Sequence, residues 1–66
     1  MMSSATVLDL RKARARLEKL AERLDGDALH AECNNGEGWH KLSIDIRNDA
    51  AACRTGAAQI ADLLGE

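Results

Sequence analysis

Apolar residues recur along the first half of the chain with the spacing of one helix face. They are separated by three or four residues, at Leu10, Ala13, Leu17, Leu20, Leu24, Ala28 and Ala31. This periodicity is typical of an amphipathic α-helix, and Ser3 or Ser4 provides its N-cap. The pattern stays in phase through Gly26, so we predict one helix over 4–33; a break at Asp25–Gly26 is the alternative.

A second apolar series begins directly after a segment rich in Asn and Gly, which predicts a loop over 34–38. The series runs through Trp39, Leu42, Ile46, Ala50, Cys53, Ala57, Ile60 and Leu64. We therefore predict a second helix over 39–64, ended by Gly65. Trp39 is in phase with this series and is expected to close the loop end of the helix pair.

Two helices of similar length joined by a short loop form an antiparallel hairpin. The predicted fold is all-α, with one domain over 1–66. A turn near residue 36 sets Leu17 opposite Cys53 and Ala57, so that large side chains face small ones. Gly56 and Ala52 suggest a close helix crossing on the second helix.

More apolar residues are present than one helix pair can cover. Ile44 forms a separate row with Ala51 and Ala58, and Leu8, Leu29 and Leu63 lie off the seam. A two-fold dimer that forms a four-helix bundle would cover them, as would docking onto a larger protein. This layout resembles the small plasmid-encoded RNA-binding hairpins that dimerise into four-helix bundles; the resemblance is architectural and rests on no motif.

The composition narrows the classes of function. Hydrophobic residues make up 45% of the 66 residues, but 12 of them are Ala and only one is aromatic, and the chain has no Pro, Phe or Tyr. This argues against a β fold. Because so short a chain cannot wall a cleft that excludes water, we do not expect an enzyme.

Positive charge is concentrated on the first predicted helix, although the net charge is −2. At about 100° per residue, four cations fall in one row on its polar side. This basic row consists of Lys12, Arg16, Lys19 and Arg23. It predicts contact with an acidic protein face or with phosphates; the alternative is a solvated surface, since exposed charge runs are most often that. With Ile44 and an exposed Trp39, the row forms the predicted partner-binding set.

Soft metal ligands are few. His30, Cys33 and His40 could converge at the loop end, but Cys53 lies roughly 20 Å from His40 along the second helix. Three ligands at irregular spacing do not make a structural zinc site, so we expect no metal and no cofactor. Two cysteines without a disulfide framework, no signal sequence and no apolar span indicate a cytoplasmic protein.

These observations favour a non-catalytic protein–protein interaction module, a small homodimer that binds a larger protein and inhibits or adapts it. Very small Ala- and Arg-rich proteins of this kind are frequent in phages and other mobile elements. The alternative is an RNA- or DNA-binding regulator that uses the basic row, although the mild net charge favours it less.

Overall fold

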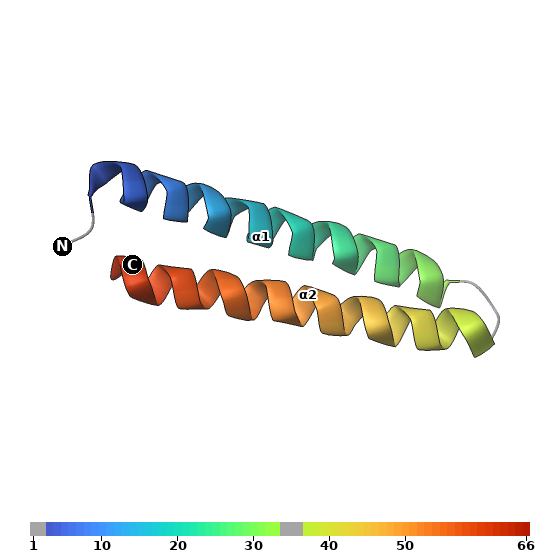
Figure 1. The fold of residues 1–66 in the computed structure, drawn as a ribbon. Helices are drawn as coiled ribbons and strands as arrows, with labels where there is room; N and C mark the ends of the chain where they lie inside the picture. Colours follow the sequence, from blue (N-terminus) through green and yellow to red (C-terminus); the bar gives the residue numbers. More distant parts are fainter. Residues whose placement is uncertain (1–2, 34–36) are drawn as a thin grey trace.

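The computed structural model describes residues 3–33 and 37–66. Helix α1 spans Ser4–Glu32 and helix α2 spans Glu37–Leu64. The two lie side by side and antiparallel, and both ends of the chain lie at the same end of the rod (Figure 1). The rod measures 51 × 14 × 13 Å. The predicted all-α helical hairpin is therefore confirmed.

The helix ends differ in detail from the sequence prediction. α1 runs through Gly26 without a break. Residues 34–36 of the predicted loop lie outside the described residues, whereas Glu37 and Gly38 belong to the first turn of α2. A glycine costs little in a first turn, because few intrahelical hydrogen bonds depend on its backbone.

Local capping explains where α1 begins and where α2 ends. The Ser3 hydroxyl accepts a hydrogen bond from the Thr6 backbone N–H at 3.2 Å, as an N-cap does. At the other end, Gly65 adopts a φ of 74°, which favours glycine. Its N–H donates to the Asp62 carbonyl and the Glu66 N–H donates to the Ala61 carbonyl. This pair of bonds is a Schellman motif.

Small side chains occupy the centre of the contact between the helices. Among the described residues, the buried ones are Ala21, Ala28, Ala31, Ser43, Ala50 and Ala57. Several of these recur every seven residues, which is the period of two helices that keep the same faces in contact. Leucine and isoleucine residues line the edges of this small-residue seam and remain half-buried, as Leu17, Leu24 and Ile46 do.

Three predicted seam positions are wrong. Leu20 is 43% exposed while its neighbour Ala21 is buried, and Leu42 is 43% exposed while its neighbour Ser43 is buried. Trp39, expected to be covered by the helix pair, is 44% exposed. The smallest side chains occupy the central positions because they allow the closest approach of the two backbones. Ser43 is tolerated there because its hydroxyl donates to the His40 carbonyl at 2.8 Å.

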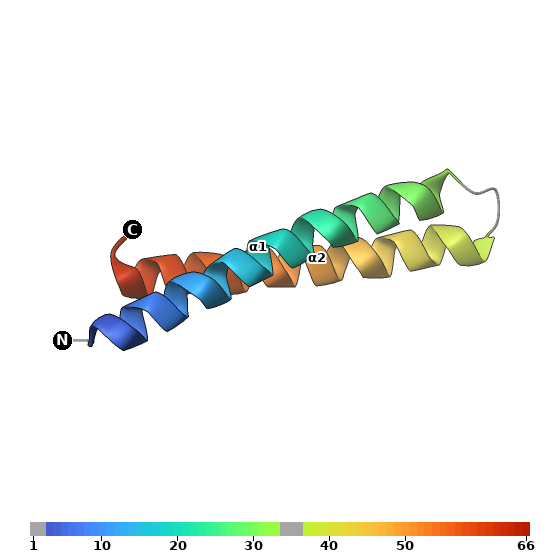
Figure 2. The same ribbon diagram turned by 90° about the horizontal axis from the view of Figure 1, so that it is seen from above.

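Gly56 lies where the two helices approach closely. The axes cross near the middle of both helices when the hairpin is viewed from above (Figure 2). A Cβ atom at Gly56 would lie 3.3 Å from Cδ1 of Leu17, which places Leu17 at the predicted level on α2. Ala52, the other residue expected at this crossing, is exposed. The close approach therefore depends on Gly56.

The two mid-helix glycines make a matched pair for a stability measurement. No atom lies within 4 Å of a Cβ built at Gly26. We expect Gly26→Ala to raise the free energy of unfolding by about 1 kcal/mol, the usual helix-propensity difference. Gly56→Ala should gain much less, because the Leu17 side chain must move. Urea denaturation followed by circular dichroism measures both; an equal gain in the two variants would contradict the close approach.

Candidate interaction surfaces

One side of the hairpin is closed by ion pairs between α1 and the second half of the chain. Arg47 Nε lies 2.6 Å from Glu32 Oε1, and Arg54 pairs with Asp25. Near the chain ends, Arg11 and Arg14 both reach the Glu66 carboxylate. We call this side the ion-paired flank. It brings arginines of both helices onto one side of the small-residue seam.

These contacts shift the titration of the carboxylates on the ion-paired flank. A hydrogen bond from Arg54 holds the pKa of Asp25 below its ordinary value, against the smaller effect of desolvation. Glu32 is lowered in the same way by Arg47, and Glu66 by Arg11 and Arg14. The pKa values of Arg47 and Arg54 are raised in return. All five groups are therefore charged at neutral pH.

The stability of the hairpin should decrease in acid for this reason. A carboxyl group with a lower pKa in the folded state contributes stability above its unfolded pKa and loses it as the pH falls through the folded value. We expect the melting temperature to fall once the pH drops below the ordinary pKa values of these carboxyl groups, 3.8 for Asp25 and 4.5 for Glu32 and Glu66. In Asp25→Asn/Glu32→Gln the part of this pH dependence due to these two residues should disappear, while the part due to Glu66 remains. Thermal melts between neutral and acid pH test this; an unchanged acid slope in the double variant would exclude these pairs as its cause.

The opposite side of the seam is mainly apolar, although it also carries the exposed carboxylates of Asp27 and Asp49. At about 100° per residue, Leu20 lies about 60° to one side of Leu17, whereas Arg14 and Asp25 lie about 60° and 80° to the other. On α2, Leu42 lies about 80° to one side of Ala50, away from Arg47. The ion pairs join the side of α1 that carries Asp25 to the side of α2 that carries Arg47. Leu20 and Leu42 lie on the opposite side of each helix and therefore share one face of the hairpin.

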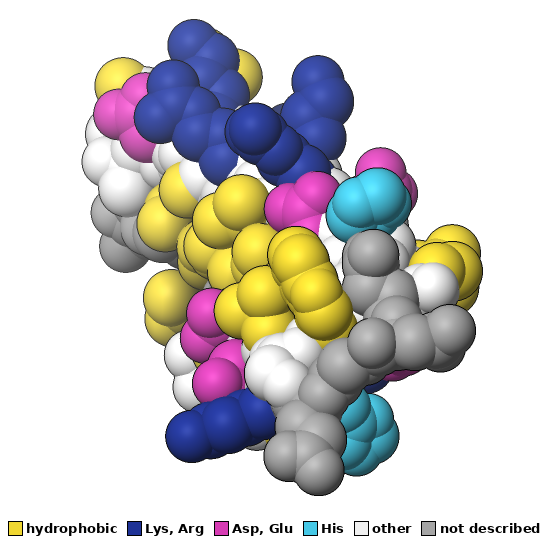
Figure 3. All heavy atoms as spheres, turned by 90° about the vertical axis from the view of Figure 1, so that its right-hand side faces the viewer, with side chains coloured by type: hydrophobic (Ala, Val, Ile, Leu, Met, Phe, Trp, Pro, Cys, Tyr) yellow, Lys and Arg dark blue, Asp and Glu magenta, His cyan; other side chains and the backbone are white. Residues whose placement is uncertain are grey.

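We call this face the open flank. Its members are apolar or small residues at or beside the seam: Ala13, Leu20 and Leu24 of α1, and Leu42, Ile46, Cys53, Gly56 and Leu63 of α2. None of the ion pairs between described residues crosses it. Hydrophobic side chains gather in one continuous area on that side of the hairpin, beneath a group of cationic side chains (Figure 3). Leu63 is 66% exposed, the largest value among the large apolar residues.

The basic row lies on the side of α1 that faces away from α2. All four members, Lys12, Arg16, Lys19 and Arg23, are exposed. None of them takes part in an ion pair within the described part of the chain, whereas Arg11, Arg14, Arg47 and Arg54 all do. Arg16 and Arg23 lean toward the open flank, because they lie about 100° and 120° from Leu17 on that side. The row is thus a set of available cations beside an apolar face.

Ile44 and Trp39, the apolar members of the predicted partner-binding set, occupy different places. Ile44 is 48% exposed and lies on the ion-paired side of α2, with the exposed Ala51 and Ala58 along the same row. Trp39 stands near the loop end. The structure therefore does not bring these two residues together with the basic row into one continuous patch.

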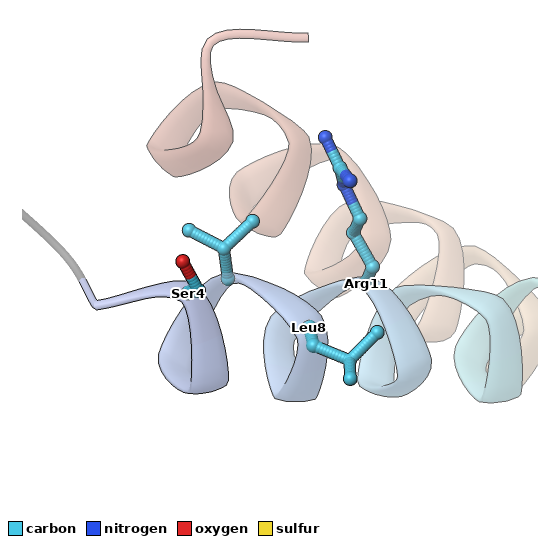
Figure 4. A pocket seen from close by; sticks show the side chains of 4 residues that line it. Ser4, Leu8 and Arg11 are labelled. Carbon is cyan, nitrogen blue, oxygen red and sulfur yellow. The ribbon is translucent and has the colours of Figure 1, made fainter.

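A shallow, open depression near the chain ends is lined by Ser4, Val7, Leu8 and Arg11. All four residues come from the first two turns of α1. Leu8 points away from α2, whereas Arg11 points toward the last turns of α2 (Figure 4). Its guanidinium is already engaged by Glu66. The depression has neither the enclosure nor the free polar groups of a small-molecule site.

The histidines and cysteines do not assemble into a metal site. His30, Cys33 and His40 are exposed, and Cys53 is half-buried beside the seam. Over residues 3–33 and 37–66, no three His, Cys, Asp or Glu side chains lie close enough together to hold a metal ion. Both cysteines are free thiols.

No family model, curated protein or solved structure matches the chain. Within the described residues, neither helix combines the length and the apolar composition required to cross a lipid bilayer. The argument for function therefore rests on the surfaces of the hairpin.

Proposed function

We propose that this chain is a non-catalytic protein–protein interaction module of the cytoplasm, which works as a helical homodimer and binds a larger protein. The observation that carries the proposal is the burial pattern. Among the described residues, every buried one is Ala or Ser, while Leu20, Leu42 and Leu63 remain 43–66% exposed. A domain of this size needs large buried aliphatic side chains for stability. A second chain supplies that burial.

Dimerisation is tested by the mass in solution. Light scattering coupled to gel filtration at micromolar concentration should report about twice the chain mass of 7.1 kDa. A folded monomer at that concentration, with full helical circular dichroism, would contradict the dimer.

The basic row is the proposed contact with the larger protein, whose facing surface would be acidic. Unpaired cations on an exposed helix side raise association rates with an acidic partner, most strongly at low salt. Lys19→Glu/Arg23→Glu should slow association, and because both residues are exposed it should leave stability within about 1 kcal/mol. Lys41→Glu, which reverses an exposed cation on α2 outside the row, is the control for a charge reversal elsewhere on the surface.

Trp39 is the proposed apolar contact with the same larger protein. Exposed tryptophans are enriched among residues that dominate binding, and this one is 44% exposed. Trp39→Ala should weaken binding about tenfold or more, whereas Leu8→Ala, at the other end of the hairpin, should change it little. Unchanged binding in Trp39→Ala and in Lys19→Glu/Arg23→Glu would remove both residue groups from the proposed interface.

A second candidate function follows from the same four cations, none of which is in an ion pair with a described residue. Phosphate contacts by the basic row, doubled in a dimer, would make the protein an RNA- or DNA-binding regulator. Binding to a labelled RNA hairpin and to a DNA duplex at increasing salt separates the two. Phosphate contacts give a steep linear fall of log affinity with log salt, whereas no measurable affinity for either nucleic acid at low salt supports the protein partner.

A further inference from the structure

The open flank has a shape and charge pattern that fit a second copy of this chain in one particular orientation. This inference rests on the dimer proposed above and names its interface. We propose that the two open flanks pack face to face about a two-fold axis at Leu20. In this arrangement α1 runs antiparallel to α1 of the partner subunit and α2 antiparallel to α2.

The open flank is the better dimer interface because ion pairs already occupy the ion-paired flank. The ion pairs Arg54–Asp25 and Arg47–Glu32 occupy the ion-paired flank. A chain docked there would have to remove water from those charges. This is costly unless the charges form well-aligned ion pairs in the new interface. The open flank exposes Leu20 and Leu42 and carries no such pair among the described residues.

Charge decides the orientation. The pairs Arg54–Asp25 and Arg47–Glu32 set residues 25–32 of α1 beside residues 47–54 of α2. Asp27 and Asp49 therefore lie at the same level of the rod, and both are on the side of the open flank. Packing α1 along α2 of the partner subunit at the same level would set Asp27 against Asp49 of the partner subunit. Like charges at such short range oppose that orientation.

The antiparallel α1–α1 arrangement turns the same aspartate into an attractive contact. A two-fold axis at Leu20 places Arg16 opposite Leu24 of the partner subunit, between Arg23 of the partner subunit and Asp27 of the partner subunit. Helical side chains lean toward their own N-terminus, and an arginine reaches roughly one turn. The Arg16 guanidinium then comes to the level of Asp27 of the partner subunit. The axis repeats the contact, so that the interface holds two such pairs.

The apolar contacts also match under this symmetry. Cδ1 of Leu17 lies 3.3 Å from where a Cβ atom at Gly56 would stand, which sets the level of Leu20 on α2 close to Gly56 and Cys53. These small residues would lie near the axis, where two α2 helices must approach closely. Leu63, at one end of the flank, would pack near Ile46 of the partner subunit, at the other end. The most exposed leucine of the hairpin is covered in this way.

Disulfide cross-linking tests the position of the axis. The background variant is Cys33→Ser/Cys53→Ala, which removes both native thiols. A residue on the two-fold axis meets its own copy, so Leu20→Cys should form a disulfide dimer in mild oxidant. Leu42→Cys is the matched control, because Leu42 is as exposed as Leu20, at 43%, but lies far from the axis. We expect at least tenfold more cross-linked dimer from Leu20→Cys.

The outcomes separate this inference from the proposed function. A wild-type monomer in light scattering would overturn both. A wild-type dimer in which Leu20→Cys cross-links no faster than Leu42→Cys would overturn the interface alone. As a second measurement, Arg16→Asp and Asp27→Arg should each raise the dimer dissociation constant about tenfold, and the double variant should restore it toward the wild-type value. A double variant as weak as the single ones would also overturn the interface.

Discussion

The substitution Ala50→Leu is expected to unfold most of the hairpin. Ala50 has no exposed surface and lies in the centre of the small-residue seam. Three extra carbons there cannot be placed without separating the helices, and overpacking of this kind costs about 1–3 kcal/mol or more. A single core in so small a domain rarely supplies more than about 3–5 kcal/mol. The Ala50→Leu chain should therefore lose most of its helical circular dichroism at 37 °C.

The adjacent residue provides the control. Ala51 is exposed on the next position of α2, so Ala51→Leu adds the same atoms and the same helix propensity without entering the seam. It should keep the wild-type melting temperature within a few degrees. If both variants melt alike, the seam is not where the structure places it.

The substitution Leu17→Asp is the second change with a large expected effect. Leu17 is half-buried at the helix crossing, with Cδ1 against Gly56. An unpaired carboxylate at this position loses the aliphatic contact and part of its hydration, at a cost of several kcal/mol. We expect Leu17→Asp to be unfolded at neutral pH, as judged by circular dichroism.

Leu29→Asp is the control for this substitution. Leu29 is 58% exposed on α1, so the same chemical change should leave the helical signal intact. A folded Leu17→Asp hairpin would show that the crossing contributes little to stability.

Residue spacing alone was enough to predict the elements. Helix positions repeat every 3.6 residues whatever packs against them, so the apolar series indicated two helices, and short-range capping by Ser3 and Gly65 is local chemistry. The continuity of α1 through Gly26 also followed from phase, because the series does not change register there.

The candidate surfaces were less predictable. The basic row could be derived from angle alone and is exposed as expected. The partition of the hairpin into an ion-paired flank and an open flank was not predicted, because it depends on which arginines meet which carboxylates across the two helices. A signal for the seam was present in the sequence: small residues recur every seven positions at Ser43, Ala50 and Ala57. The predicted apolar series includes Ala50 and Ala57 but has Leu42 in place of Ser43, because it ranks residues by hydrophobicity.

The sequence by itself determined that this protein is a pair of long helices, since helix formation, capping and the polar side of each helix depend on contacts within a few residues. Only the tertiary structure decided which stripe faces the partner helix, that Leu20, Trp39 and Leu42 stay exposed, and that one flank is closed by charge. The physical reason is close packing. Two helices approach most closely over their smallest side chains, and that optimum depends on both helices together.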